Sequence, residues 1–160
     1  RPKKCGHIPG KDILTIDEYL PRLESVLKSA PNLFVIARTD VEELEIGIKR
    51  IKTFIDNGAS FVMLEGIRNI EDLILIRKEI PENIALTVNL INGGQTKSIS
   101  LKKLKKLGAN IAIYSTPCLF SAHYAINKSL KELLDNDGTL SAISDTCTLQ
   151  KSREFLESTS

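Results

Sequence analysis

The sequence lacks any apolar stretch long enough to span a membrane. No run of about 18 consecutive apolar residues occurs in its 160 residues, although 42% of them are hydrophobic. It also lacks a charged start followed by an apolar stretch and a small-residue cleavage site, which is the pattern of a secretory signal peptide. We therefore expect a soluble, cytoplasmic protein with no membrane partner.

Cysteine is scarce, and its spacing argues against two common roles. The three cysteines, Cys5, Cys118 and Cys147, are odd in number and widely separated, and they form no CxxC pair. Neither a disulfide framework nor a zinc site is therefore indicated. We expect Cys118 and Cys147 to be structural residues.

A large excess of charge of one sign is also missing. The 22 Lys and Arg residues against 20 Asp and Glu residues give a formal net charge of +2, which is too small to argue for nucleic-acid binding. The densest basic run, at residues 102–106, is interleaved with leucines at helical spacing. Such a run is typical of the solvated face of a helix, so we expect no nucleic-acid partner.

What the sequence does contain is a cysteine in an unusual setting near its start. Cys5 follows Lys3 and Lys4 and precedes Gly6 and His7. Cationic neighbours stabilise a thiolate, which makes a thiol a better proton carrier, and glycine lets the backbone approach a ligand closely. The segment is either a reactive loop within residues 1–12 or an ordinary surface cysteine beside lysines.

Short apolar runs recur along the chain at similar intervals. Strands that are buried on both faces of a parallel sheet are uniformly apolar rather than alternating. The runs predict four strands: Leu33 to Ala37, Phe61 to Leu64, Ala85 to Val88, and Ile111 to Tyr114.

Helical periodicity fills the intervals between these runs, with a repeat of roughly 25 residues, the length of one strand–helix unit of a barrel or doubly wound sheet. Residues that cap or stop helices support this interpretation. The expected caps and stops are Asp40 and Gly58 for the first helix, Pro81 for the second, Ser98 or Ser100 and Gly108 for the third, and Pro117 and Gly138 for the fourth.

The units predict a parallel α/β fold that amounts to half of an eight-stranded barrel. We expect residues 1–160 to form a single domain, a partial barrel, with four strand–helix units over residues 33–138 and a C-terminal tail or helix over residues 139–160. The chain starts at Arg1 rather than at an initiator Met and opens on a polar segment. We therefore expect the chain to begin partway through a longer protein.

Polar side chains follow all four predicted strands: the fourth ends in Ser115-Thr116, and the other three carry charged or amide groups. Chemistry gathers at the C-terminal ends of strands in parallel α/β folds, and these ends carry Arg38, Glu65 and Asn89. Arginine offers a fork for carboxylate or phosphate, asparagine a neutral donor, and glutamate a base or a metal-shell acceptor. The set suits a polar anionic ligand. Alternatively, Arg38 pairs with Asp40 or Glu65 at the rim, and Asp40 caps the next helix.

These motifs follow one another in a recognisable order. They are Lys3-Lys4-Cys5-Gly6-His7, Ala37-Arg38-Thr39-Asp40, Leu64-Glu65-Gly66, and Asn89 with Gly93-Gly94 and Thr96. The set resembles the isocitrate lyase and phosphoenolpyruvate mutase superfamily, and within it most closely the 2-methylisocitrate lyase group. The similarity spans nearly the whole chain but corresponds only to the C-terminal half of such a protein.

This resemblance implies a (β/α)8 barrel that acts on a small 2-hydroxy or 2-keto carboxylate held on Mg²⁺. It also implies that Cys5 protonates the carbanion-like fragment that cleavage releases. No direct metal ligand is expected in this segment, because the family's metal-binding aspartates belong to strands upstream of Arg1. Glu65 and His7 are expected in the outer shell of the metal. The implied catalytic residues are Cys5, His7, Arg38 and Glu65.

The resemblance extends to the substrate contacts. The residues implied to bind substrate are Cys5, Gly6, Arg38, Glu65, Asn89, Leu90 and Ile91. Two arginines that the family uses for the distal end of the substrate align with Phe120 and Gln150, beside Lys151, and a usual proline is Lys97. These departures predict a preference for dicarboxylates.

The leading interpretation is a Mg²⁺-dependent carbon–carbon lyase that cleaves a small 2-hydroxy di- or tricarboxylate. The alternatives are an oxaloacetate decarboxylase-type 2-keto acid enzyme on the same barrel, and a catalytically silent half-barrel that serves as an assembly module. The resemblance further implies a homo-oligomer, a dimer of dimers that exchanges C-terminal helices. The tail from Ser152 to Leu156 is the expected exchanged helix.

Overall fold

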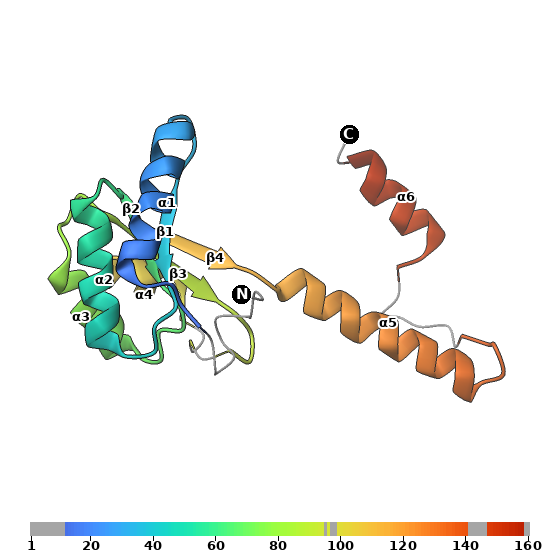
Figure 1. The fold of residues 1–160 in the computed structure, drawn as a ribbon. Helices are drawn as coiled ribbons and strands as arrows, with labels where there is room; N and C mark the ends of the chain where they lie inside the picture. The colour runs from blue at the N-terminus through green and yellow to red at the C-terminus, as the bar shows by residue number, and fades with distance from the viewer. Residues whose placement is uncertain (1–11, 95, 97–98, 141–146, 159–160) are drawn as a thin grey trace. The chain divides into compact units, whose positions relative to one another are not determined.

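The structure is a computed structural model that describes residues 12–94, 96, 99–140 and 147–158 (Figure 1). The chain divides into two compact units, one ending at Pro117 and one covering Cys118–Ser160. They are described separately below, and the expectation of a single domain over residues 1–160 stays a prediction. The predicted catalytic loop lies outside the described residues, apart from its last position.

Four short strands form a parallel sheet in the first unit, in the order β1-β2-β3-β4. Sequential parallel strands require a crossover connection between each pair, and helices provide it here. The predicted α/β pattern is therefore confirmed. The strands are β1 (Ile36–Thr39), β2 (Phe61–Leu64), β3 (Ala85–Leu90) and β4 (Ile111–Tyr114).

The first strand begins later than its apolar run predicted. Leu33 and Phe34, at the start of that run, are 72% and 82% exposed, and Phe34 packs edge-on against Phe61 with ring centroids 5.2 Å apart. The polar residues Arg38 and Thr39 belong to the strand instead, because they continue the pairing register with β2. Position in the sheet, rather than apolar character, sets the boundaries of β1.

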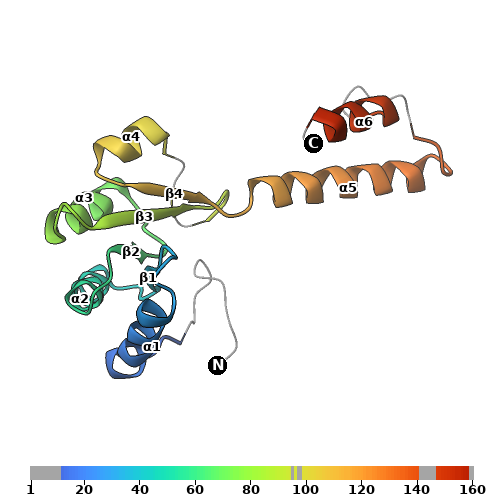
Figure 2. The same cartoon turned by 90° about the horizontal axis from the view of Figure 1, so that it is seen from above.

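Four helices cover one face of this sheet (Figure 2). The sequence pattern did not predict the first of them, although its start carries a capping box: the Thr15 hydroxyl accepts from the Glu18 N–H, and the Glu18 carboxylate accepts from the Thr15 N–H. The helices are α1 (Ile16–Ser29), α2 (Leu44–Asp56), α3 (Ile70–Glu79) and α4 (Leu101–Lys106).

Most of the predicted helix ends are confirmed. Gly58 and Gly108 follow α2 and α4 with φ angles of 93° and 83°, a left-handed conformation that glycine adopts without strain. Ser100 caps α4 by accepting from the Lys103 N–H. The prediction that Asp40 caps α2 is wrong: the N-cap is Glu43, which makes no side-chain capping bond.

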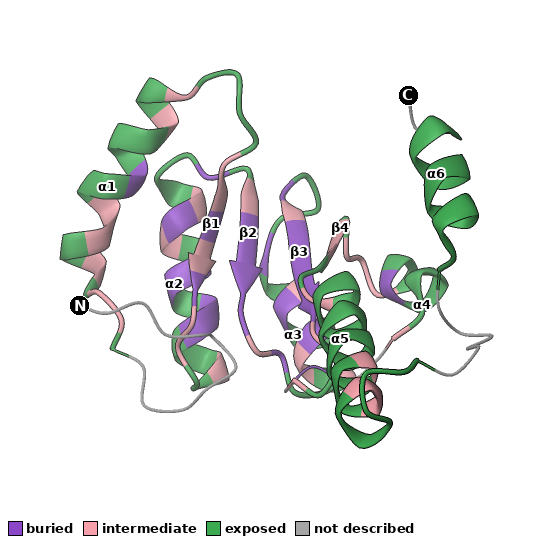
Figure 3. Cartoon of the chain, turned by 90° about the vertical axis from the view of Figure 1, so that its right-hand side faces the viewer, coloured by how far each residue is buried: buried purple, intermediate pink, exposed green. Residues whose placement is uncertain are grey.

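The strand register gives the sheet two different faces, because side chains alternate along each strand. The outer face packs against the helices and is buried (Figure 3). The core there includes Ala37, Val62, Leu64, Leu86 and Val88 from strands, and Ile51, Phe54, Leu73 and Ile76 from helices. The inner face carries Ile36, Phe61, Ala85, Ile111 and Ile113, which are only partly buried.

The second unit contains α6 (Leu149–Ser158) and all of α5 (Pro117–Asp135) except its first residue. Neither helix has a buried residue, and Tyr124 and Leu134 are 72% and 84% exposed. The predicted helix from Ser152 to Leu156 lies within α6. Among the described residues, no helix combines the length and the apolar character needed to cross a membrane.

Candidate active site

A row of polar side chains crosses the C-terminal ends of all four strands. Arg38 lies in β1, Glu65 directly follows β2, Asn89 lies in β3, and Ser115 directly follows β4. Phe61 pairs with Ala85, and Glu65 and Asn89 each lie four residues further along, so they share one face of the sheet. Parallel pairing thus brings residues that are distant in sequence to one edge.

Arg38 is held between two carboxylates. Its Nε lies 2.6 Å from Asp40 Oδ1, its Nη2 lies 2.8 Å from Asp40 Oδ2, and its Nη1 lies 2.9 Å from Glu65 Oε2. The Asp40 side chain is 8% exposed and that of Glu65 is 0% exposed, whereas that of Arg38 is 39% exposed. The alternative interpretation, a salt bridge at the rim, is confirmed for both partners. Of these three side chains, that of Arg38 is the one substantially exposed to solvent.

Asn89 continues the row from Glu65 to the fourth strand. Its Nδ2 donates to Glu65 Oε1 and Oε2 at 3.1 and 3.3 Å, and its Oδ1 accepts from Ser115 Oγ at 2.6 Å. An acceptor on one side and a donor on the other fix the orientation of the amide. Ser115 was not among the predicted site residues, and its place directly after the fourth apolar run is the one signal that points to it.

Together with Asp40, the row combines two carboxylates with one guanidinium. Both carboxylates are already engaged, Asp40 by Arg38 and Glu65 by Arg38 and Asn89. Among residues 12–94, 96, 99–140 and 147–158, no group of three or more His, Cys, Asp or Glu residues could hold a metal ion.

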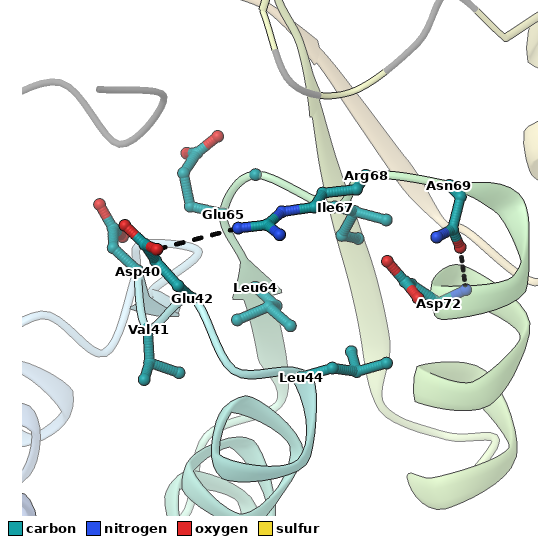
Figure 4. A pocket seen from close by; sticks show the side chains of 11 residues that line it. Asp40, Val41, Glu42, Leu44, Leu64, Glu65, Ile67, Arg68, Asn69 and Asp72 are labelled. Carbon is teal, nitrogen blue, oxygen red and sulfur yellow. Dashed lines mark hydrogen bonds and ion pairs between the residues drawn. The ribbon is translucent and has the colours of Figure 1, made fainter. Parts of the chain in front are cut away.

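A cavity of about 300 Å³ lies beside the row, between the loops that follow β1 and β2 (Figure 4). Asp40 and Glu65 line one part of it, and Asp72 lines another. Arg68 lies 3.8 Å from Glu42 in the same lining. The excess of acidic side chains suits this cavity poorly for an anion, so Arg38 is the better anchor for a carboxylate ligand.

The remaining predicted site residues are placed differently. Leu90 is 8% exposed and belongs to the core under the helices, so its side chain lies on the opposite face from Asn89, and any contact with substrate would involve its backbone. Ile91 is partly buried. Cys5, Gly6 and His7 lie outside the described residues, and their roles stay predictions.

The two other cysteines do not pack in a core. Cys118 and Cys147 are both exposed free thiols, so the prediction that they are structural is wrong. Phe120 lies in α5 and is 42% exposed, and Gln150 lies in α6 and is exposed. Lys97 lies outside the described residues.

Parallel strands joined by helices on one face, with polar residues at the C-terminal strand ends, define the architecture of a (β/α) barrel enzyme. The sequence model of the phosphoenolpyruvate phosphomutase family matches residues 3–134. The chain therefore belongs to this family, as its motifs indicated.

Individual relatives agree with this membership. The chain is 30% identical over 140 residues to a probable 2-methylisocitrate lyase 1 of Corynebacterium glutamicum, a match that covers 84% of the chain and 46% of that protein. A solved 2,3-dimethylmalate lyase, a member of the phosphoenolpyruvate mutase/isocitrate lyase superfamily, matches 98% of the chain and 55% of its own with a TM-score of 0.85 at 26% identity.

A second solved structure is that of an oxaloacetate acetylhydrolase in complex with the inhibitor 3,3-difluorooxalacetate. It matches with a TM-score of 0.78 at 30% identity, covering 98% of the chain and 57% of its own. The chain spans about half the length of the curated relatives it matches. The described sheet corresponds to part of their barrel.

Proposed function

We propose that the complete protein is a carbon–carbon lyase for a small 2-hydroxy di- or tricarboxylate, and that this chain supplies the carboxylate-binding and proton-donating part of its site. The observation that carries the proposal is the setting of Arg38. Its guanidinium is held by Asp40 and Glu65 yet is 39% exposed at the strand ends. A guanidinium that is fixed on one side and open on the other suits a bidentate carboxylate.

The donors that remain on the row support this role. Nε and Nη2 of Arg38 donate to Asp40, and Nη1 faces Glu65, but each Nη carries a second N–H. Nδ2 of Asn89 likewise has a second N–H besides the one that faces Glu65. Arg38 and Asn89 would bind carboxylate oxygens of the substrate, and Glu65 would orient both.

Cleavage of a 2-hydroxy acid breaks the bond between C2 and C3. The 2-hydroxyl loses its proton and becomes a carbonyl, and the bonding electrons pass to C3, which becomes a carbanion stabilised by its carboxylate. The Cys5 thiol then gives a proton to C3. His7 and Glu65 are the candidates in this chain for accepting the hydroxyl proton. The products are a 2-oxo acid and a second carboxylate.

We also propose that the complete protein requires Mg²⁺, which would supply Lewis-acid activation of the substrate. Support comes from the resemblance of the motifs to the isocitrate lyase and phosphoenolpyruvate mutase superfamily, which implies a substrate held on Mg²⁺. The described residues do not fit the ion directly, so its ligands would come from elsewhere in the complete protein.

The test is turnover by the complete protein with 2-methylisocitrate and 2,3-dimethylmalate, measured as release of the 2-oxo acid. We expect Cys5→Ser to lower kcat by at least about a hundredfold, because general acid catalysis contributes about 10² to 10⁴, while leaving Tm nearly unchanged. Cys118→Ser is the matched control and should keep wild-type activity, since that thiol is exposed. A Cys5→Ser variant that kept most of its activity would remove the lyase assignment.

A second candidate is a hydrolase or decarboxylase of a short 2-keto acid. It is favoured by the similarity to an oxaloacetate acetylhydrolase at 30% identity. Oxaloacetate belongs in the same assay: oxalate and acetate as products would indicate hydrolysis, and pyruvate with carbon dioxide would indicate decarboxylation. Absence of turnover with all three compounds would instead favour a silent assembly module.

We further propose that the protein is a homo-oligomer, a dimer of dimers. Support comes from the second unit, in which neither helix has a buried residue and several large apolar side chains are exposed. Exposed apolar surface of this kind favours association. A monomeric mass by light scattering at micromolar concentration would count against it.

A further inference from the structure

Side chains of α1 and α2 form hydrogen bonds with the end of β1 that carries Arg38. Arg50 Nε donates to Thr39 Oγ1 at 2.9 Å, and the Tyr19 hydroxyl accepts from the backbone N–H of Arg38 at 3.3 Å. Thr39 lies on the outer face of the sheet and is 3% exposed. Both contacts therefore act on the strand away from the face where a ligand would bind.

Within the described part of the sheet, the backbone N–H of Arg38 has no partner strand. The Thr39 carbonyl accepts from the Glu65 N–H at 2.9 Å, so the backbone groups of Thr39 face β2. Successive residues of a strand direct these groups to opposite sides, and those of Arg38 therefore point to the outer edge of β1. Among the described residues, the Tyr19 hydroxyl is the group that accepts from this N–H.

The Phe54 ring contacts both side chains, Tyr19 and Arg50. Phe54 stacks on Tyr19 with ring centroids 4.5 Å apart and planes inclined by 28°. The guanidinium carbon of Arg50 lies 5.8 Å from the centroid of the same ring. Phe54 is 0% exposed and Arg50 is 8% exposed. We call Tyr19, Arg50 and Phe54 the outer clamp.

The cost of burying Arg50 suggests a role beyond packing. No carboxylate pairs with it in the described part of the chain, and burial lowers the pKa of its guanidinium. A buried cation without a counter-ion is unfavourable. The hydrogen bond that its side chain does make goes to Thr39, the neighbour of Arg38.

We propose that the outer clamp positions Arg38 for carboxylate binding, with Tyr19 and Arg50 as positioning residues, which rests on the function proposed above for Arg38. Asp40 and Glu65 fix the guanidinium end of that side chain, and the clamp fixes the backbone from which it extends. Binding groups must be held within about 0.5 Å, and a misplacement of about 1 Å costs about a hundredfold in rate. Both the guanidinium and the backbone of Arg38 therefore need to be held in position.

Thr39 offers the sharpest test, because Thr39→Val keeps the shape of the side chain but removes the acceptor of the Arg50 bond, whereas Thr39→Ser keeps it. In the complete protein, we expect Thr39→Val to lower kcat/KM about tenfold, chiefly through KM, and Thr39→Ser to stay near wild type. Thr53→Val, in α2 but outside the clamp, is the control. An unchanged kcat/KM in Thr39→Val overturns the proposal.

Amide hydrogen exchange supplies a readout that does not depend on turnover. Thr39→Val and Tyr19→Phe should each speed exchange at residues 36–39, while exchange at residues 85–90 of β3 stays the same. Lost activity with unchanged exchange at residues 36–39 would show that the clamp does not hold β1 and would overturn the proposal. Should the wild-type protein neither turn over nor bind malate by calorimetry, the proposed function fails, and exchange alone decides whether the clamp holds the strand.

Discussion

Arg38 Nη1 and Glu65 Oε2 lie 2.9 Å apart at the ends of neighbouring strands, yet the Glu65 side chain is 0% exposed and that of Arg38 is 39% exposed. The buried carboxylate thus anchors a cation that still faces solvent. This asymmetry separates two effects of changing Arg38. Loss of its charge removes a counter-ion from Asp40 and Glu65, whereas loss of its planar fork alone breaks the two-bond contact with Asp40 and the fork that a ligand would use.

Arg38→Ala should lower the free energy of unfolding by roughly 1–3 kcal/mol, less than for a fully buried pair because Arg38 is partly exposed. Arg38→Lys should cost less stability, because it keeps the charge, but should still lower kcat/KM, because it loses the fork. Urea denaturation and steady-state kinetics are the measurements. Arg68→Ala is the control, since its pair with Glu42 is exposed at both ends and should contribute little. Equal stability of Arg38→Ala and Arg68→Ala would contradict the anchoring role.

The stability of the fold should fall at alkaline pH through Tyr19. Burial raises the pKa of its hydroxyl above the ordinary value of 10.0, although the hydrogen bond from Arg38 and the charge of Arg50 oppose the rise. The folded state therefore holds this proton more tightly than the unfolded chain does. The contribution to stability is complete below pH 10 and is lost as the pH rises through the folded pKa.

Chemical denaturation as a function of pH checks this expectation. Above pH 10, the free energy of unfolding should fall less steeply for Tyr19→Phe than for the wild type. Tyr124→Phe should leave the slope unchanged, because Tyr124 is 72% exposed. Identical slopes for Tyr19→Phe and the wild type would show that the Tyr19 hydroxyl is not what titrates.

Mg²⁺ should bind the complete protein but not this chain alone. Mg²⁺ is usually held by one or two carboxylates with waters and substrate oxygens, and the carboxylates of Asp40 and Glu65 are engaged by Arg38. We expect no site-specific binding by the 160-residue chain at micromolar Mg²⁺ in titration calorimetry. Removal of Mg²⁺ by a chelator should abolish turnover by the complete protein. Micromolar binding by the chain alone would mean that its own residues form the metal site.

The complete enzyme should prefer 2,3-dimethylmalate to 2-methylisocitrate. Phe120 stands where the resemblance expects an arginine, and it cannot form the charge-assisted bonds that a distal carboxylate needs. The measurement is the ratio of kcat/KM for the two compounds, which Phe120→Arg should shift towards 2-methylisocitrate. Phe155→Arg, at another exposed phenylalanine, should not shift it. A wild-type preference of about tenfold or more for 2-methylisocitrate, over 1 kcal/mol, would show that Lys151 or another cation replaces the missing arginines.

Local signals made much of the fold predictable. Gly58, Gly108 and Pro81 end helices through their own backbone restrictions, so their effect can be read without the tertiary structure. The start of β1 could not be read in this way. Leu33 and Phe34 are as apolar as the residues of a buried strand. Only the pairing with β2 shows that they lie outside β1, whereas Arg38 and Thr39 lie within it.

The candidate active site could likewise be predicted from the sequence only in part. The rule that polar groups gather at the C-terminal strand ends predicts Arg38, Glu65 and Asn89. It does not say which partner a side chain chooses. Asp40 has the residue type and the position of a helix cap, and only the structure shows that Arg38 binds it instead. The same rule selects Ser115 at the end of the fourth strand but assigns it no role, which only its hydrogen bond with Asn89 shows.

The hydroxyl of Tyr19 has a consequence for solubility as well. A strand at the edge of a sheet presents unpaired donors and acceptors to which a strand of another molecule can add, and fibril growth begins with such additions. β1 lies at one edge of the described sheet, and its outward N–H at Arg38 is already occupied by Tyr19. A foreign strand would have to displace a tyrosine that is stacked on Phe54 before it could add in register. In the 160-residue chain taken by itself, Tyr19 would thereby hinder such additions at this edge.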